Sequence, residues 1–243
     1  MSEITRPENM PKTAMIMAAG FGTRMRPLTD SMPKPLVPVL GKPLIDYSMD
    51  LLVESGVGEA VVNSHYLAEM LEGYLRQRKN TPHIIISRED GILETGGGIK
   101  NALKLFDSEE FFVVNSDVIC LSGKTPALLR LWQHWDGAKM DALLLLHKVE
   151  DAIGYDGAGD FFIETDGSLR RRLTSEKAPF VFTGVQVISR RLFTDSPEGA
   201  FSLNVLYNRN LVRIGALVHD GNWLHVGSES ELRQAETWLE KPV

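Results

Sequence analysis

The sequence from residue 14 to residue 29 is AMIMAAGFGTRMRPLT, and this stretch decides the fold. Its apolar beginning predicts a β-strand, and Gly20 and Gly22 follow where that strand ends. Two glycines spaced by one residue allow a tight turn in which backbone N–H groups approach an anion closely. Arg24 and Arg26 add positive charge, and a guanidinium can bind phosphate oxygens with two hydrogen bonds. The stretch favours a phosphate-binding loop, although an ordinary surface turn could contain the same two glycines.

Two common phosphate-binding motifs do not match this loop. A dinucleotide-binding fingerprint has a third glycine where Met25 stands, and the G-K-[ST] end of a Walker loop is absent. An NAD-linked oxidoreductase would also need an acidic residue after the second predicted strand, which instead ends in Asn63-Ser64-His65. The sequence therefore argues against a dinucleotide-dependent enzyme.

Up to about residue 150, apolar runs alternate with helical patterns. The runs lack polar alternation, as expected for strands covered on both faces, and they are Ala14–Ala18, Ala60–Asn63, His83–Ser87, Phe111–Asn115 and Asp141–His147. The spacing of apolar residues between them predicts helices over Pro43–Ser55, Leu67–Leu75, Gly97–Phe106 and Thr125–Trp135. This order predicts an α/β fold with a mostly parallel sheet and helices on both sides.

The pattern changes from about Gly154 onward. Shorter strands are expected at Asp160–Ile163, Leu169–Leu173 and Phe180–Ser189, which suggests a mixed or antiparallel portion of the sheet. Near the end, Ser228 and Glu231 form a capping-box pattern that predicts a last helix reaching Leu239. Residues 1–12 are polar and are expected to be a flexible leader in front of a single domain over residues 13–243.

Composition excludes several classes of protein. The net charge of -6 argues against a broad nucleic-acid-binding face, which needs a basic excess. The single cysteine, Cys120, rules out an intrachain disulfide and a Cys-based zinc site, and we expect a packed, inert thiol there. The longest apolar run, Ala142–Leu146, is far too short to cross a bilayer, and the N-terminus lacks a signal-peptide core. We therefore expect a cytoplasmic protein without nucleic-acid or membrane partners.

The glycine loop also carries a family resemblance. The pattern A-A-G-x-G-T-R-M-x-P-L-T, followed by P-K-P-L-V-P-V from Pro33, resembles the signature of the sugar-phosphate nucleotidyltransferase family. The resemblance implies a Rossmann-like αβα sandwich with a mostly parallel or mixed sheet, the nucleotide-diphospho-sugar transferase fold. It implies a nucleotide half at about residues 13–150 and a sugar-phosphate half at about 151–243. It further implies that the triphosphate of an NTP is bound by Ala19, Gly20, Gly22, Thr23 and Arg24, with Lys34 stabilising charge at the α-phosphate.

A second glycine-rich segment, Glu94-Thr95-Gly96-Gly97-Gly98, is expected to precede a helix. Three consecutive glycines cost chain entropy, so close approach of a ligand would explain them, and a flexible lead-in to the helix is the alternative. By the family resemblance, Glu94 and Gly97 contact the nucleobase and ribose.

The fourth predicted strand ends in Asn115-Ser116-Asp117. A carboxylate at the carboxyl end of a strand faces the ligand crevice of an open α/β sheet. Mg²⁺ is typically held by one or two carboxylates together with substrate phosphates. The triplet resembles the metal-binding segment of the family, which implies that Asp117 is a magnesium ligand.

One position departs from the family pattern. The family usually has a second metal-binding aspartate in a segment like W-x-D-V-G-T, whereas this chain has His225 in Trp223-Leu224-His225-Val226-Gly227-Ser228. Magnesium prefers oxygen ligands, so an imidazole is not an equivalent replacement. Three readings stay open: His225 holds a magnesium-bound water or touches a phosphate, it favours Mn²⁺, or the metal site is weakened.

The sugar-phosphate half is less informative. Gly159-Asp160-Phe161, the pair Glu176-Lys177, and Thr183-Gly184 resemble short family segments around the sugar. Ordinary turn chemistry explains these segments almost as well. The residues expected to bind the sugar phosphate are Asn115, Gly159, Asp160, Lys177, Thr183 and Gly184.

The resemblance implies nucleotidyl transfer from an NTP to a sugar 1-phosphate, with Arg24, Lys34 and Asp117 as catalytic residues and Mg²⁺ as cofactor. The short chain looks most like the bacterial N-acetylmuramate-1-phosphate uridylyltransferases of peptidoglycan recycling. Mannose-1-phosphate guanylyltransferase and glucose-1-phosphate thymidylyl- or uridylyltransferase are the alternatives. A nucleotide or NDP-sugar sensor is the non-enzymatic alternative, because His225 replaces a metal ligand. We expect a monomer or a small homo-oligomer.

Overall fold

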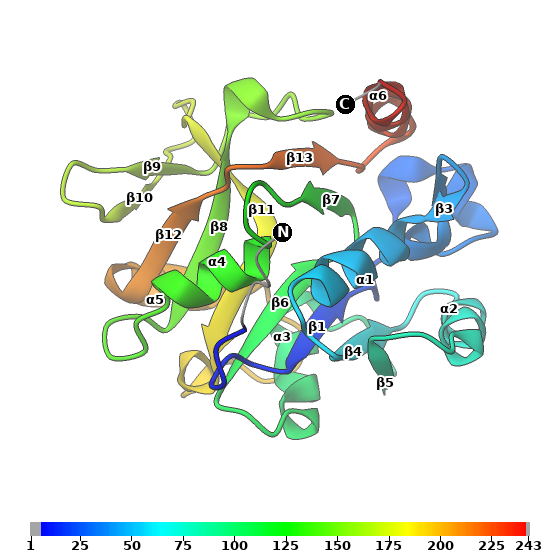
Figure 1. The fold of residues 1–243 in the computed structure, drawn as a ribbon, viewed down its shortest axis with the longest axis horizontal. Coiled ribbons are helices and arrows are strands. Elements are labelled where there is room, and N and C mark those ends of the chain that lie inside the picture. Colours follow the sequence, from blue (N-terminus) through cyan, green and yellow to red (C-terminus); the bar gives the residue numbers. More distant parts are fainter. Residues whose placement is uncertain (1–5, 242–243) are drawn as a thin grey trace.

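The computed structural model describes residues 6–241, and a large mixed β-sheet forms the centre of this part of the chain (Figure 1). The strands of this sheet are β1 (Thr13–Met17), β4 (Glu59–Ser64), β5 (His83–Arg88), β6 (Glu110–Asn115), β8 (Ala142–Lys148), β9 (Phe161–Ile163), β10 (Leu169–Arg171), β11 (Phe180–Ser189) and β12 (Ile214–Val218). Two small sheets pair β2 (Pro38–Val39) with β3 (Lys42–Pro43), and β7 (Val118–Leu121) with β13 (Asn222–His225).

The first half of the chain forms a parallel sheet. Strands β5, β4, β1 and β6 are neighbours in that order and run in the same direction. Strand β11 is antiparallel to both of its long neighbours, β6 and β8, and β12 continues the sheet parallel to β8. The five strands expected before residue 150 are confirmed, and the expected change to a mixed portion is also confirmed.

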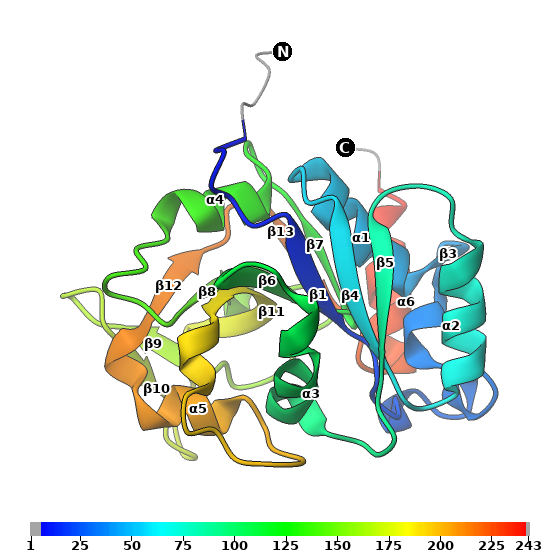
Figure 2. The same ribbon diagram turned by 90° about the horizontal axis from the view of Figure 1, so that it is seen from below.

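Helices cover both faces of the sheet, which confirms the αβα sandwich (Figure 2). On one face, apolar side chains of α1 (Leu44–Glu54), α2 (Ala68–Gln77) and α4 (Ala127–His134) form a core with β1, β4 and β6. On the other face, α3 (Glu94–Ala102) and α5 (Asn204–Arg209) share a second core with the same strands. Helix α6 (Glu229–Leu239) packs on a third core with Ile119 and Leu224 of the β7–β13 pair.

Several elements differ from the sequence expectation. Helix α3 begins at Glu94, so the three glycines lie inside its first turns and do not precede it. Strands β7, β12 and β13 and the short helix α5 were not expected. Each is four to six residues long, which is too short for a periodic pattern to stand out. The helix start at Ser228 is confirmed, because its hydroxyl accepts a hydrogen bond from the Glu231 N–H at 3.3 Å. The carboxylate of Glu231 accepts from the N–H of Gly227 and not from that of Ser228, so the capping box is incomplete.

Residues 1–5 of the expected leader lie outside the described residues. The described part of the leader packs on the domain. Met10 is buried, and the guanidinium of Arg6 donates hydrogen bonds to the carbonyl of Gly56 and to those of Met10 and Pro11. These contacts attach residues 6–11 to the end of α1.

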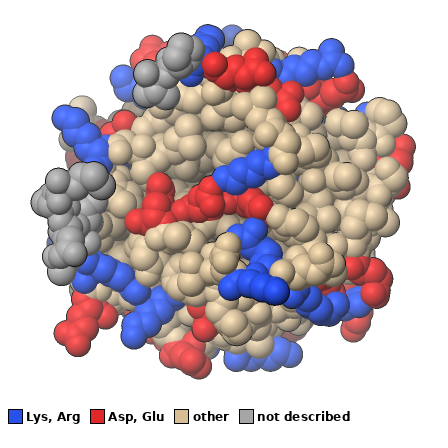
Figure 3. All heavy atoms as spheres, turned by 45° about the vertical axis from the view of Figure 1, so that its right-hand side comes forward, with Lys and Arg blue, Asp and Glu red and all other residues tan. Residues whose placement is uncertain are grey.

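Other expectations concern the surface and the single thiol. Within residues 6–241, no helix is long and apolar enough to span a membrane. On the face drawn in Figure 3, Lys and Arg side chains alternate with Asp and Glu, without a broad basic field. Cys120 is buried, and burial raises the pKa of its thiol well above the usual range, which fits an inert side chain.

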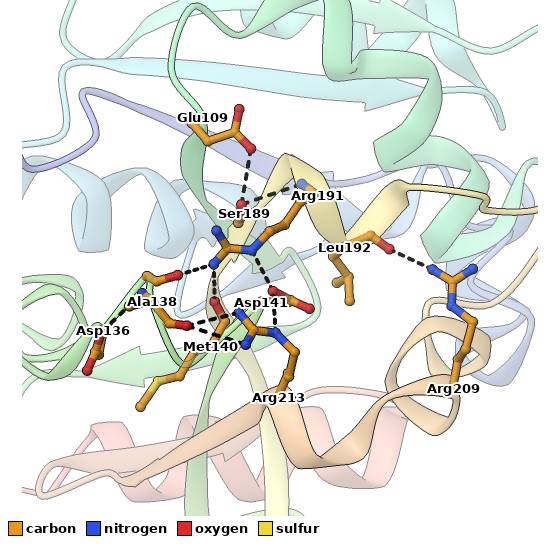
Figure 4. A network of polar contacts seen from close by, with 11 residues as sticks. Glu109, Asp136, Ala138, Met140, Asp141, Ser189, Arg191, Leu192, Arg209 and Arg213 are labelled. Atoms are coloured by element: carbon orange, nitrogen blue, oxygen red, sulfur yellow. Dashed lines mark hydrogen bonds and ion pairs between the residues drawn. The ribbon is translucent and has the colours of Figure 1, made fainter.

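A charged cluster joins the ends of three strands (Figure 4). Asp141, just before β8, accepts hydrogen bonds from Nε of Arg191 at 2.6 Å and from Nε of Arg213 at 3.0 Å. The backbone of Asp141 also pairs with the carbonyl of Arg213 and the N–H of Ser189. This carboxylate therefore links the start of β8 to the end of β11 and the start of β12.

We expect Asp141→Asn to lower the free energy of unfolding by about 1.5–3 kcal/mol, because Arg191 and Arg213 lose the negative charge of a buried acceptor. Asp136→Asn is the matched control, since that half-exposed aspartate pairs with Lys139 and with the N–H of Ala138 at the surface, and we expect a much smaller change. Urea denaturation of the two variants measures the difference. Equal stabilities would mean that the cluster of Asp141 with two arginines does not support the sheet.

Candidate active site

A cleft of about 290 Å³ lies at the carboxyl ends of β1, β4 and β6. Ligands of open α/β sheets bind beyond this edge, because the loops that follow parallel strands meet there. The cleft is lined by Met17, Ala18, Ala19, Gly20, Gly22, Thr23, Arg24, Lys34, Pro35, Asn63, Glu89, Ile92, Glu94, Thr95, Asn115, Ser116, Asp117 and Gly227. Segments more than 200 residues apart in the sequence thus form one cleft.

The first glycine loop packs against the segment that carries Lys34. Gly22 has a φ of 63°, and a Cβ atom there would lie 2.9 Å from Cβ of Lys34 and 3.1 Å from Cγ2 of Thr29. The hydroxyl of Thr29 also donates to the carbonyl of Gly22 at 2.9 Å. Only glycine fits this position, and its absence of a side chain brings Arg24 and Lys34 to the same cleft. All five residues expected at the triphosphate line this cleft.

Lys34 and Asp117 form an ion pair on the wall of the cleft, with Nζ 2.9 Å from Oδ2. Lys34 is buried, so its ammonium group is held by this contact. Burial opposes ionisation of Asp117, but attraction to Lys34, and more weakly to His225 and Arg24, outweighs it and lowers the pKa of the carboxyl. The carboxylate is therefore ionised at neutral pH.

The glycines of the segment from Glu94 to Gly98 pack against other parts of the chain, whereas a bound ligand was expected to explain them. A Cβ atom at Gly96 would lie 2.3 Å from the ring of Phe201, and one at Gly97 would lie 2.3 Å from the carbonyl oxygen of Gly199. The N–H groups of both glycines donate to the carbonyl of Phe201. The chain itself therefore occupies the space that these glycines leave free. Glu94 lines the cleft, whereas Gly97 does not, so the geometry gives no support to a nucleotide contact at Gly97.

Two cleft residues, Asn63 and Glu89, were not recognised from the sequence. Glu89 is buried, and its carboxylate accepts hydrogen bonds from Nδ2 of Asn63 at 2.7 Å and from the N–H of Leu93 at 3.2 Å. Burial raises the pKa of Glu89. Asn63 ends one predicted strand, and Glu89 comes shortly after another, just as Asp117 comes shortly after a third. Their place at the carboxyl end of a strand was the signal that could have identified them.

His225 lies close to the cleft but is not among the residues that line it. Its Nδ1 lies 3.3 Å from Oε2 of Glu231 and forms no hydrogen bond of good geometry within residues 6–241. Glu231 accepts a hydrogen bond from the N–H of Gly227 at 2.6 Å, so its position is fixed. The described residues contain no group of three or more His, Cys, Asp or Glu side chains that could hold a metal ion.

The residues expected around the sugar phosphate lie in three places. Asn115 lines the cleft, and Gly184, with a φ of 82°, is next to it, since a Cβ there would lie 2.8 Å from Cβ of Asn115. Thr183 is buried and donates to the carbonyl of Leu145, which is a structural contact. Lys177 is exposed. It lines neither this cleft nor a neighbouring cavity, which is formed by Asp160, Arg171, Arg172 and Thr174.

Gly159 and Asp160 lie beside that neighbouring cavity. Gly159 has a φ of 70° and approaches the carbonyl oxygen of Ala178 so closely that a Cβ would lie 2.2 Å from it. Asp160 lines the cavity, and its carboxylate accepts a hydrogen bond from the N–H of Phe182 at 2.8 Å.

Comparison with known proteins agrees with this arrangement. The family model for nucleotidyl transferases matches residues 13–158. An N-acetylmuramate alpha-1-phosphate uridylyltransferase of Caulobacter vibrioides is 42% identical over 235 residues, which cover 94% of this chain and 97% of that protein. A protein of the same name from Neisseria meningitidis serogroup B is 34% identical over 92% of this chain and 96% of its own length. A UDP-glucose pyrophosphorylase complexed with UDP-glucose shares the fold with a TM-score of 0.79, at 18% identity over 95% of this chain and 98% of its own.

We expect Gly97→Ala to destabilise the protein in the absence of any ligand, by about 1–3 kcal/mol, because the new Cβ would collide with the backbone of Gly199. Gly91→Ala is the matched control, since no atom lies within 4 Å of a Cβ at that position. Thermal unfolding without nucleotide compares the two. A normal melting temperature for Gly97→Ala would show that chain packing does not explain this glycine.

Proposed function

The chain belongs to the nucleotidyl transferase family, and on that premise we propose that it transfers UMP from UTP to N-acetylmuramate 1-phosphate. The products are UDP-N-acetylmuramate and pyrophosphate. The single observation that supports this choice of nucleotide and sugar phosphate is the similarity to the Caulobacter vibrioides relative, which extends over nearly the whole length of both chains. We further propose that the reaction belongs to peptidoglycan recycling in the cytoplasm.

The reaction is an in-line displacement at the α-phosphorus of UTP. An oxygen of the sugar phosphate forms the new P–O bond, and the bond to the bridging oxygen of the β-phosphate breaks, so pyrophosphate leaves with the electron pair. Such transfers depend mainly on positioning and charge neutralisation, with little covalent chemistry for the protein. Arg24 and Lys34 line the same cleft, which supports Arg24 at the leaving β,γ-phosphates and Lys34 at the α-phosphoryl oxygens.

Members of this family generally use a divalent metal ion, and we propose Mg²⁺ for this chain. The residues fit an ion held by one carboxylate and the phosphates of the substrate, because Asp117 is ionised and lines the cleft. Such an ion would supply positive charge to the phosphates of the substrate. We propose Asp117 as the protein residue that would hold this ion. Because Nδ1 of His225 lies beside Glu231, only Nε2 of that imidazole would be left for a metal-bound water or a phosphate.

We expect pyrophosphate release in the presence of Mg²⁺ only when UTP and N-acetylmuramate 1-phosphate are supplied together. The measurement is a panel of four NTPs against sugar 1-phosphates that include mannose and glucose derivatives. Another productive pair, such as GTP with mannose 1-phosphate, would correct the substrates and keep the reaction class. Binding of an NTP without turnover of any pair would favour a sensor.

We expect Lys34→Ala to lower kcat roughly 100- to 1000-fold, because one preorganised cationic contact in the transition state is lost. Lys42→Ala is the matched control, since the ammonium group of Lys42 pairs with Asp50 and stacks on Tyr47 outside the cleft. Steady-state kinetics and the circular dichroism of both variants distinguish a catalytic defect from misfolding. Near-normal turnover of folded Lys34→Ala would show that Lys34 has no catalytic role.

A further inference from the structure

A second cavity of about 190 Å³ lies in the sugar-phosphate half of the chain. It is lined by Asp160, Arg171, Arg172 and Thr174. Two arginines and one aspartate are among these lining residues, which leaves an excess of one positive charge. Sites of this kind suit an anion, because arginine presents several N–H donors in a fixed planar arrangement.

The protein holds both arginines in place and leaves some of their donors free. Arg172 donates through Nε to the carbonyl of Gly159 at 2.7 Å and through Nη1 to those of Leu173 and Thr174 at 3.3 and 3.4 Å. Arg171 stacks on the ring of Phe161, with Cζ 4.8 Å from the ring centroid, and donates through Nη2 to Oδ1 of Asn204. Its Nε is buried and has no hydrogen-bond partner within residues 6–241. A buried guanidinium donor without a partner is costly, and an anion in the cavity would offset that cost.

The cavity and the cleft are both in contact with one short segment of β11. Gly184 of β11 lies against Asn115, which lines the cleft, and the N–H of Phe182 donates to Asp160, which lines the cavity. These two positions are two residues apart in an irregular part of β11, where Gly184 has a φ of 82°. The cleft and the cavity therefore lie beside the same short segment of β11.

A second path of contacts joins the two sites through Tyr155. The hydroxyl of Tyr155 accepts a hydrogen bond from the N–H of Gly159 at 3.2 Å. The ring of the same tyrosine meets the imidazole of His225 edge-on, with centroids 6.0 Å apart. The loop that carries Gly159 and Asp160 therefore lies between the His225 side of the cleft and the arginines.

We propose that Arg171 and Arg172 bind the lactyl carboxylate of the acceptor and thereby select an acidic sugar 1-phosphate. This inference rests on the proposed function, in which the acceptor is N-acetylmuramate 1-phosphate. That sugar differs from N-acetylglucosamine by a lactyl ether at C3, which ends in a carboxylate on the far side of the ring from the phosphate. With the phosphate in the cleft beside Asn115, the ring lies along this segment of β11 and the carboxylate reaches the cavity.

The test compares two acceptors that differ only in the lactyl ether, N-acetylmuramate 1-phosphate and N-acetylglucosamine 1-phosphate, each with UTP. Arg171→Gln and Arg172→Gln are expected to lower kcat/KM for the muramate acceptor roughly 10- to 100-fold, because a charged hydrogen bond is lost. The loss with the glucosamine acceptor is expected to be at least about tenfold smaller. The selectivity ratio of the enzyme thus falls in both variants.

Arg170→Gln is the matched control, because this neighbouring arginine pairs with Glu164 and Glu176 and stacks on Phe162, and it does not line the cavity. It is expected to keep the selectivity ratio of the wild type. Arg171→Lys retains a charge and provides a variant that is less disruptive to packing. Equal losses with both acceptors in folded Arg171→Gln and Arg172→Gln would assign these arginines a structural role and overturn the proposal.

Direct binding separates a failure of this inference from a failure of the proposed function. Calorimetric titration of N-acetylmuramate 1-phosphate into protein loaded with a UTP analogue that cannot be cleaved between the α- and β-phosphates is expected to give weaker binding for both glutamine variants than for wild type. If the wild type binds this acceptor but transfers no UMP, the proposed reaction fails, and the change in affinity still decides the role of the arginines. If the wild type does not bind this acceptor, the carboxylate site is overturned as well.

Discussion

The ion pair between Lys34 and Asp117 is the contact on which the cleft depends. It joins the segment after the glycine loop to the end of β6, across 83 positions of sequence. The carbonyl of Asp117 also accepts a hydrogen bond from the N–H of Val226, so the C-terminal segment is attached at the same residue. Gly22 packs directly on the side chain of Lys34. Three distant parts of the chain therefore meet around one partly buried charge pair, which holds the ammonium group of Lys34 at the wall of the cleft.

The two halves of the domain are coupled by backbone contacts at the start of α3. The segment around Gly199 and Phe201, from the sugar-phosphate half, occupies the space left free by Gly96 and Gly97. Lys100 reinforces this contact through the carbonyls of Ser196 and Pro197. Glu94, held at a φ of 58° at the beginning of the same helix, lines the cleft. Strained backbone of this kind persists only where surrounding contacts maintain it, and the neighbouring half supplies them here.

Much of the architecture could be read from the sequence. The apolar runs without polar alternation identified the strands of the sheet, although β5 at its edge is only partly buried. Ser228 with Glu231 marked the start of the last helix, because both signals are local. The glycine loop, Lys34 and Asp117 were also expected, since they belong to contiguous motifs that follow strands. The sugar-phosphate half was less predictable, because its strands are short and its turns use residues that any turn can use.

The sequence by itself determined the class of fold, the order of its main elements and the residues of the glycine loop that line the cleft, because each of these depends on neighbours along the chain. Only the tertiary structure showed that the glycines of α3 make room for other parts of the chain. Only the tertiary structure showed that Asn63 and Glu89 line the cleft. It also brought Arg171 and Arg172 beside Asp160, at the same segment of β11 as Asn115. The physical reason is that these contacts join side chains and backbone groups from distant segments, and no local pattern of residues encodes where such segments meet.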